Sequence, residues 1–272
     1  MRLAHLIERV YLRPMLITAD GHAAIRQVIE NKYNLGSIKS ENTDEDTDLF
    51  GDPMPKPYDF MPGVRAIPVN GPIGYKVSGI EKVCGVCDVG LVNQWTKEAM
   101  ADNTIDTILY DFNTPGGEIT QVMETAELIE EAGKTKNTIA FTDTMACSAG
   151  MWLMAASNEI YTTKTADIMS VGVYSYLLDY SKMYEEAGIK VEPFVSGDLK
   201  GIGIPGRPLT DSQRQHLQAE VDMLGEMFRG YMKKRMPKMP DDMMRGQSVM
   251  GLNTAKAGLT NLVSSMDDIF AK

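Results

Sequence analysis

Histidine, cysteine and positive charge are all scarce in this chain. Only three of its 272 residues are histidine, and none of them lies near a candidate nucleophile in the sequence. The formal net charge is -10, which disfavours binding to nucleic-acid phosphates or to anionic lipid. The three cysteines are too few for a disulfide framework in a chain of this size, so a reducing compartment fits the composition better.

The cysteine pattern does not predict a metal or cofactor site. Cys84 and Cys87 form a CxxC pair, but a zinc site needs two further ligands. His5, His22 and His216 have no matching spacing. A redox pair is the other special interpretation. We favour two small loop residues over either role, and we expect no metal and no cofactor.

Long apolar runs are missing as well. No stretch reaches the roughly 18 consecutive apolar residues that a membrane span requires. The N-terminal stretch MRLAHLIERVYLRPMLIT has Arg and Glu inside its apolar part and lacks the core of a signal peptide. The sequence therefore predicts a soluble protein with no signal peptide, no transmembrane segment and no membrane partner.

Composition divides the chain into three segments. Residues 1–35 place apolar side chains at helical spacing and predict an amphipathic N-terminal arm, which Arg13-Pro14 interrupts. Residues 36–62 are acidic and rich in proline, which predicts a linker. Residues 63–272 predict one folded domain. We expect the arm, together with the methionine-rich stretch 223–244, to provide apolar surface for self-assembly.

Strands and helices alternate through the third segment. Strand-like runs at 64–74, at 104–117 (ending at Pro115 and two glycines) and at 137–144 alternate with helix-like stretches at 90–102, 119–134 and 149–158. A long amphipathic helix is predicted at 210–235. Alternation of this kind is typical of an α/β fold with βαβ crossovers and a mostly parallel sheet.

The turn DFNTPGGE, residues 111–118, is the first of three motifs that can carry chemistry. Pro115 fixes the turn, and Gly116 and Gly117 leave their backbone N–H groups bare before a helix. Such amides can stabilise the oxyanion of an acyl-transfer reaction. A plain tight turn between a strand and a helix gives the same pattern.

The stretch TDTMACSAGMW places Ser148 where a strand passes into a helix. A strand-to-helix elbow holds a hydroxyl exposed, and the small neighbours Ala146, Ala149 and Gly150 let a substrate backbone approach. Serine is also a common helix N-cap. Nucleophile and cap both remain open for this residue.

The third motif, SGDLKGIGIPGRPLT at 196–210, holds Lys200 in a loop rich in glycine and proline. A lysine in such a loop is usually a surface charge. A buried lysine favours its neutral amine, which can act as a general base. A serine without a histidine needs such a base.

Taken together, PGG, ACSAG and SGDLKGIGIPGRPLT resemble the signal-peptide-peptidase-A family of serine peptidases. The resemblance runs from about residue 64 to about residue 265 and includes SVGV at 170–173. It implies a ClpP/crotonase-like fold of repeated ββα units and a Ser-Lys dyad. TPGG stands here where relatives often have SPGG, and ACSAG where many have AASGG; neither change removes a needed atom.

The resemblance assigns roles to six residues. Ser148 is the expected nucleophile and Lys200 the expected general base, both supplied by one chain. The expected oxyanion donors are the backbone N–H groups of Gly116, Gly117 and Ala149, and Ser170 is expected to orient the lysine amine. Members of this fold commonly form rings, which implies a homo-oligomer.

The N-terminal stretch RVYLRPMLITADGHAAIRQVI resembles the opening of bacteriophage head-maturation proteases of the family. This implies a serine endopeptidase that cleaves scaffold and capsid proteins during head maturation, in the host cytoplasm or the procapsid interior. Two alternatives remain: a cytosolic peptidase that degrades proteins or peptides, and a catalytically inactive assembly or scaffold protein on the same fold.

Overall fold

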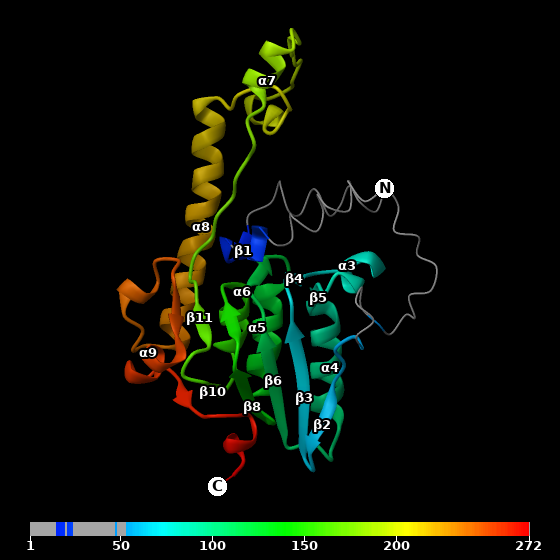
Figure 1. Cartoon of the computed structure of the whole chain (residues 1–272), viewed down its shortest axis with the longest axis vertical. Helices are drawn as coiled ribbons and strands as arrows, with labels where there is room; N and C mark the ends of the chain where they lie inside the picture. The colour runs from blue at the N-terminus through cyan, green and yellow to red at the C-terminus, as the bar shows by residue number, and fades with distance from the viewer. Residues whose placement is uncertain (1–14, 20, 24–46, 48–52, 272) are drawn as a thin grey trace.

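The computed structural model describes residues 15–19, 21–23, 47 and 53–271 (Figure 1). Its centre is a six-stranded sheet in the order β13-β10-β8-β6-β3-β2. All neighbours in this sheet are parallel except β2 and β3. The strands are β2 (Tyr58–Met61), β3 (Val64–Asn70), β6 (Thr107–Asn113), β8 (Asn137–Thr142), β10 (Glu159–Thr162) and β13 (Asn261–Leu262). The predicted α/β class with a mostly parallel sheet is confirmed.

Two smaller sheets lie beyond the carboxyl ends of these strands. One has the order β1-β7-β4-β5 and the other β12-β11-β9. Their strands are β1 (Met15–Ile17), β4 (Ile73–Gly74), β5 (Cys87–Asp88), β7 (Gly116–Glu118), β9 (Met145–Cys147), β11 (Asp167–Met169) and β12 (Ser248–Met250). In chain order β6, β7 and α5 form one ββα unit, and β8, β9 and α6 form the next, as the sequence predicts.

The helices follow the predicted pattern. They are α3 (Gly79–Val83), α4 (Val89–Ala101), α5 (Val122–Ala132), α6 (Ala149–Met154), α7 (Ser181–Glu186), α8 (Asp211–Arg235) and α9 (Gly251–Lys256), with the short 3₁₀ helices η1 (Asp198–Gly201), η2 (Asp241–Met243) and η3 (Asp267–Ile269). Helices α4, α5 and α6 bury their apolar faces against one side of the main sheet, around Ile67, Tyr110, Phe112, Ile129 and Trp152. Within the described residues, none of the helices is both long enough and apolar enough to cross a bilayer.

Helix α8 connects the body to a projecting lobe that holds α7 and η1 (Figure 1). Its C-terminal part is fixed to α6, because the Trp152 ring stacks on Phe228 at 4.6 Å between centroids and on Tyr231 at 5.3 Å. Arg235 also donates hydrogen bonds to the carbonyls of Ala155, Ala156 and Ser157, which follow α6. The lobe is therefore carried by a helix with a firmly anchored base.

The N-terminal expectations are only partly testable. Leu3, Leu6, Ile7 and Val10 of the expected helical arm lie outside the described residues. Met15–Ile17 is a strand, not part of a helix, because it pairs antiparallel with β7. The expected linker 36–62 also ends differently: Tyr58–Met61 is strand β2 of the main sheet, where Phe60 packs with Phe270. Pairing with β3 therefore moves the start of the folded domain to before residue 62.

The methionine-rich stretch 223–244, expected to provide apolar surface for assembly, does so only in its first part. Helix α8 ends at Arg235. Met232, Met236, Met239 and Met244 are buried in the main core, so they are packing residues. Met223 and Met227 of the same stretch are 55% and 39% exposed, so its first part does offer apolar surface. Further large exposed apolar side chains lie on the lobe: Leu178, Tyr180, Met183, Ile189, Phe194 and Val195.

Candidate active site

Ser148 sits at the junction of β9 and α6, at the carboxyl end of the sheet. Its backbone has φ 56° and ψ −115°, a strained combination for a residue with a side chain. The strain persists because the strand before it is fixed on both sides. On one side the Ser148 N–H donates to the Met169 carbonyl of β11 at 2.7 Å, and on the other the Cys147 N–H donates to the Thr114 carbonyl at 3.0 Å. The structure therefore has the strand-to-helix elbow that the sequence predicts.

The hydroxyl of Ser148 has no partner among the residues that the structure describes. The side chain is 1% exposed, and its Oγ makes no hydrogen bond there. It does not cap α6, since no side-chain capping bond forms. A buried, unpaired hydroxyl costs free energy and calls for a functional explanation. The cap interpretation is wrong, and the nucleophile interpretation keeps its support.

Cys147, the neighbour of Ser148, is a poor alternative nucleophile. Burial, with a smaller contribution from Asp167, raises the pKa of its thiol to about 12. The Sγ donates to the Asp167 carbonyl at 3.6 Å. Because the reactive species of cysteine is the thiolate, this side chain stays an inert thiol at neutral pH.

The PGG turn lies directly against Ser148. Gly116 has φ +99°, and a Cβ placed on it would lie 2.9 Å from Ser148 Cβ and 3.0 Å from the Cys147 carbonyl oxygen. A Cβ on Gly117 would lie 2.0 Å from the Ile73 carbonyl oxygen. Only glycine fits at either position. The two glycines are thus required by close packing of backbone around the serine.

Thr114 joins this turn to the serine segment, which sequence reasoning missed. Its backbone forms a parallel bridge with Ala146, and the Cys147 N–H donates to the Thr114 carbonyl at 3.0 Å. The Gly116 N–H donates to Thr114 Oγ1 at 3.2 Å. One of the three expected oxyanion donors therefore already has a partner. Gly117 lies in β7 between Leu16 of β1 and Ile73 of β4. Ala149 opens α6, where amides lack intrahelical acceptors.

Ser170 is also beside the nucleophile. It follows Met169 as Ser148 follows Cys147, and those two residues are paired across the parallel strands β11 and β9. Its φ is 55°, its side chain is 7% exposed, and its Oγ donates to the Gly246 carbonyl at 3.1 Å. The structure brings Ser148, Gly116, Gly117, Ala149 and Ser170 together.

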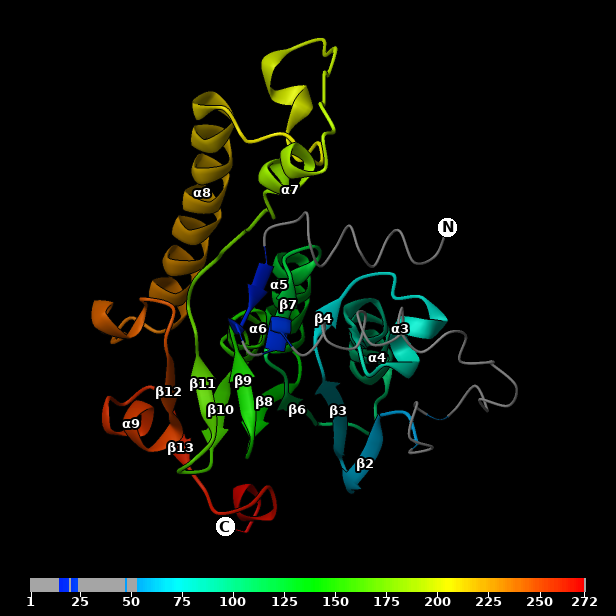
Figure 2. The ribbon, with the colours of Figure 1, turned by 45° about the horizontal axis from the view of Figure 1, so that its top comes forward.

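Lys200 is not brought to this group within the chain. It lies on η1 in the lobe, which contacts the N-terminal part of α8, and its side chain is exposed. Figures 1 and 2 both show the lobe, coloured yellow-green to yellow, well away from α6. The expectation that one chain supplies both groups of the dyad is wrong for this conformation, because the segment between β11 and α8 projects outward on α8 instead of folding over the site.

The sequence around this site matches a known peptidase family. The family model of peptidase family S49 matches residues 130–272, which is more than half of the chain. The chain belongs to peptidase family S49. The matched region contains Ser148, Ser170 and Lys200, and family membership supports a protease, hence a hydrolase.

Three relatives illustrate the family's range. The chain is 29% identical over 171 residues to the capsid assembly protease C of Escherichia phage lambda, covering 63% of this chain and 39% of that protein. It is 28% identical over 171 residues to the head-tail preconnector protein GP5 of Enterobacteria phage P21, covering 63% and 34%. It is 30% identical over 130 residues to a putative signal peptide peptidase SppA of Enterococcus faecium, covering 46% and 37%.

The S49 chain thus matches well under half the length of these relatives. Among solved structures it is similar to an enoyl-CoA hydratase/isomerase family member, with 13% identity and a TM-score of 0.40 over 77% of this chain and 69% of the other.

Proposed function

We propose that this S49 chain is a serine endopeptidase in which Ser148 is the nucleophile and Lys200 of a second copy is the general base. The observation that carries the proposal is the strained Ser148 elbow with its buried, unpaired Oγ against the Gly116 turn. Strain of this kind is retained at functional sites, where the surrounding structure holds it in place.

The chemistry follows from these groups. Ser148 Oγ attacks the scissile carbonyl carbon while its proton passes to a neutral lysine amine, and the backbone N–H groups of Gly117 and Ala149 stabilise the oxyanion. Collapse of the tetrahedral intermediate expels the new amine, which takes the proton from the lysine. Water then hydrolyses the acyl-enzyme by the same route, and we assign to Ser170 the role of orienting the amine.

We assign the lysine to a second copy because the lobe that carries it exposes large apolar side chains, as surfaces that contact a partner do. Phe194 is 95% exposed and Ile189 53%, on the same lobe as Lys200. Apolar side chains exposed in this way are unfavourable in water and mark surfaces that contact a partner. Docking the lobe over a neighbouring body would bury these side chains and take the lysine amine out of water, which favours its neutral, basic form.

For substrates, we propose scaffold and capsid proteins of a phage head. Two phage proteins are among the relatives and align with 63% of the chain, and the stretch RVYLRPMLITADGHAAIRQVI resembles the opening of head-maturation proteases. Alignment length does not separate the two classes, because a cellular relative, a probable protease SohB of Buchnera aphidicola, aligns with 66%. A peptidase of cellular type is the other outcome. The two differ in what is cut: the first predicts discrete cleavage of co-expressed capsid proteins, whereas the second predicts degradation of unfolded protein generally.

The first test is mass spectrometry of capsid proteins, and of unfolded casein, incubated with the wild type and with Ser148→Ala. We expect the variant to lose at least about a thousandfold in rate. Ser157→Ala is the matched control, because Ser157 is another buried serine, 3% exposed, whose Oγ is also unpaired in the described structure. Equal processing by wild type and Ser148→Ala would end the protease assignment and leave an inactive assembly protein.

A further inference from the structure

Strand β1 (Met15–Ile17) lies in a position that the proposed mechanism does not use. It pairs antiparallel with β7, in the register Met15 with Glu118, Leu16 with Gly117 and Ile17 with Gly116. On its other side Met15 exchanges both backbone hydrogen bonds with Tyr174, at 2.8 and 3.2 Å. A segment distant in sequence thus fills the space between the PGG strand and the 170–174 segment (Figure 2, blue).

This position borders the nucleophile. A Cβ on Gly116 would lie 2.2 Å from the Leu16 carbonyl oxygen and 2.9 Å from Ser148 Cβ, so both groups flank the same α-carbon. Leu16 is paired in register with Gly117, one of the expected oxyanion donors. The Leu16 carbonyl is therefore placed as the carbonyl of a bound peptide would be.

The side chains of β1 indicate which kinds of side chain the groove can hold. Met15, Leu16 and Ile17 are 4%, 0% and 3% exposed, so all three side chains are buried, and Leu16 packs in the main apolar core. Beyond Ile17 the groove continues into a cavity of about 550 Å³, lined by Thr18, Ala19, the 170–174 segment and polar residues of α8 such as Gln218 and Arg229. An extended peptide longer than β1 has room to continue there.

Two contacts hold β1 in the groove from its C-terminal side. The Thr18 N–H donates to the Pro115 carbonyl at 2.9 Å, and His22 Nδ1 lies 2.5 Å from the Tyr174 hydroxyl oxygen. Both partners belong to the walls of the groove itself. The N-terminal segment is therefore attached to the same two segments, the PGG turn and residues 170–174, that would bind a substrate.

We propose that the groove between β7 and the 170–174 segment binds extended apolar peptides, and that the chain's own Met15–Ile17 occupies it as an internal competitor. The inhibition rests on the proposed peptidase function, but the binding does not. Strand addition of this kind gives affinity through main-chain hydrogen bonds and selectivity through side-chain sites. A tethered segment competes at an effective concentration on the order of millimolar, so substrates must displace it before Ser148 can react.

The test uses full-length protein and needs no catalysis. A fluorescein-labelled peptide of residues 12–19, LRPMLITA, is titrated into Ser148→Ala and into the same variant carrying Leu16→Asp, with fluorescence anisotropy as the signal. A carboxylate at this fully buried position should eject β1. We expect the double variant to bind the peptide at least tenfold more tightly.

Ala23→Asp is the matched control, because it adds the same charge to the same segment at an exposed position that does not line the groove or its cavity. It should bind the peptide as weakly as Ser148→Ala alone. If Leu16→Asp lowers the melting temperature, Leu16→Ala removes the apolar contact without a charge and should still raise the affinity. Equal affinity in all the variants would overturn the proposal.

A second measurement separates the two proposals. With Ser148 intact, Leu16→Asp should raise the rate of casein hydrolysis at least fivefold, and intact mass should confirm that the chain is uncut. Tighter peptide binding without any hydrolysis supports the groove and rejects the peptidase. Hydrolysis that does not change with Leu16→Asp, in an active enzyme, rejects the internal competitor.

Discussion

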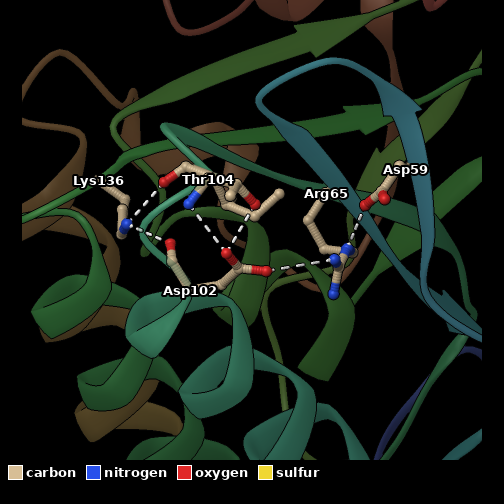
Figure 3. Close-up of polar contacts among 6 residues, drawn as sticks. Asp59, Arg65, Asp102, Thr104 and Lys136 are labelled. Carbon is tan, nitrogen blue, oxygen red and sulfur yellow. Dashed lines mark hydrogen bonds and ion pairs between the residues drawn. The ribbon is translucent and has the colours of Figure 1, made fainter.

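The two ends of the central sheet are built in opposite ways. At the carboxyl ends of its strands, Gly116, Ser148, Met169 and Ser170 all have positive φ, and Ser148 Oγ is buried without a partner in the described structure. At the amino ends, polar groups are joined in one network of hydrogen bonds and ion pairs (Figure 3). Residues with positive φ therefore lie where the chemistry is proposed, and none of the residues in the network has a positive φ.

The network at the amino ends ties four elements together. Lys136 Nζ donates to the carbonyls of Asp102 and Ile105, at 2.9 and 2.6 Å. Asp102 accepts from the Thr104 N–H and hydroxyl and lies 3.7 Å from Arg65 Nη2. Arg65 in turn pairs with Asp59 of β2. This end of the molecule contributes stability and makes no contact with the candidate site.

Carboxylates show the same difference. The hydrogen bonds from Thr104, helped by Arg65, lower the pKa of Asp102. At the other end, burial and the nearby charge of Asp143 raise the pKa of Asp111 to about 6. Ionised carboxylate is therefore favoured at one end and disfavoured at the other. In open α/β sheets ligands bind at the carboxyl ends of the strands. The Asp111 carboxyl and the Ser148 hydroxyl, whose burial destabilises the fold, both lie at that end.

Gly116→Ala, at the carboxyl end of the sheet, should cause the largest loss of activity among these substitutions. The added Cβ would meet Leu16, Ser148 and Cys147 at a backbone position with φ +99°. We expect proteolysis to fall at least about a hundredfold, because even small shifts of a nucleophile are costly, and stability to fall by about 1–3 kcal/mol. Rates on casein and urea unfolding measure both.

Gly258→Ala is the control for that substitution. Gly258 also has positive φ, +71°, but a Cβ there would meet nothing within 4 Å. It should cost about 1–2 kcal/mol of stability and leave the rate unchanged. Full activity in Gly116→Ala would contradict the close packing proposed around Ser148.

Asp111→Asn should change how stability depends on pH. Below about pH 4 the carboxyl is protonated in the folded and unfolded states and costs nothing. Between about pH 4 and 6 only the folded state keeps the proton, so stability falls as pH rises, and above pH 6 the full cost is present. The variant should be more stable than wild type by about 1–3 kcal/mol at pH 7.5 and equal to it at pH 4.

Thermal unfolding at the two pH values checks this. Asp102→Asn should change stability in the opposite direction. The pKa of Asp102 is lowered, so its ionised form stabilises the folded state at neutral pH and the variant should be less stable there. A loss of stability at pH 7.5 in Asp111→Asn would show that the carboxylate is stabilised in a way that burial and Asp143 do not describe.

Lys136→Ala should give the smallest effect on function. It removes two partly buried hydrogen bonds to backbone carbonyls, so we expect a loss of about 1–3 kcal/mol in unfolding free energy. The rate of proteolysis below the melting temperature should not change, since this end of the sheet is remote from Ser148. Lys97→Ala, an exposed lysine on α4, is the control and should change neither.

Much of this arrangement could be predicted from the sequence. The alternation of strands and helices has a strong periodic signal, and Pro115 and the paired glycines mark a turn that only one residue type allows. Ser148 and Ser170 each follow a short strand, and pairing of those strands brings them together. These features depend on local sequence and on the regular topology of a parallel sheet.

Three features depended on tertiary contacts that sequence does not display. Met15–Ile17 is a strand only because β7 and Tyr174 pair with it, although the apolar run MLIT after Pro14 was a usable signal. Thr114 Oγ1 takes the Gly116 amide, which no motif announces. The direction in which the Gly- and Pro-rich segment carries Lys200 is set by the docking of α8, far along the chain.

The most direct test of a dyad shared between copies is to mix two inactive variants. Ser148→Ala keeps its lysine and Lys200→Ala keeps its serine, so mixed assemblies contain complete sites at their interfaces. After mixing and subunit exchange, casein hydrolysis should return to roughly a quarter of the wild-type rate, with Lys182→Ala as an active control from the same lobe. No recovery in assemblies proven to be mixed would contradict the shared dyad.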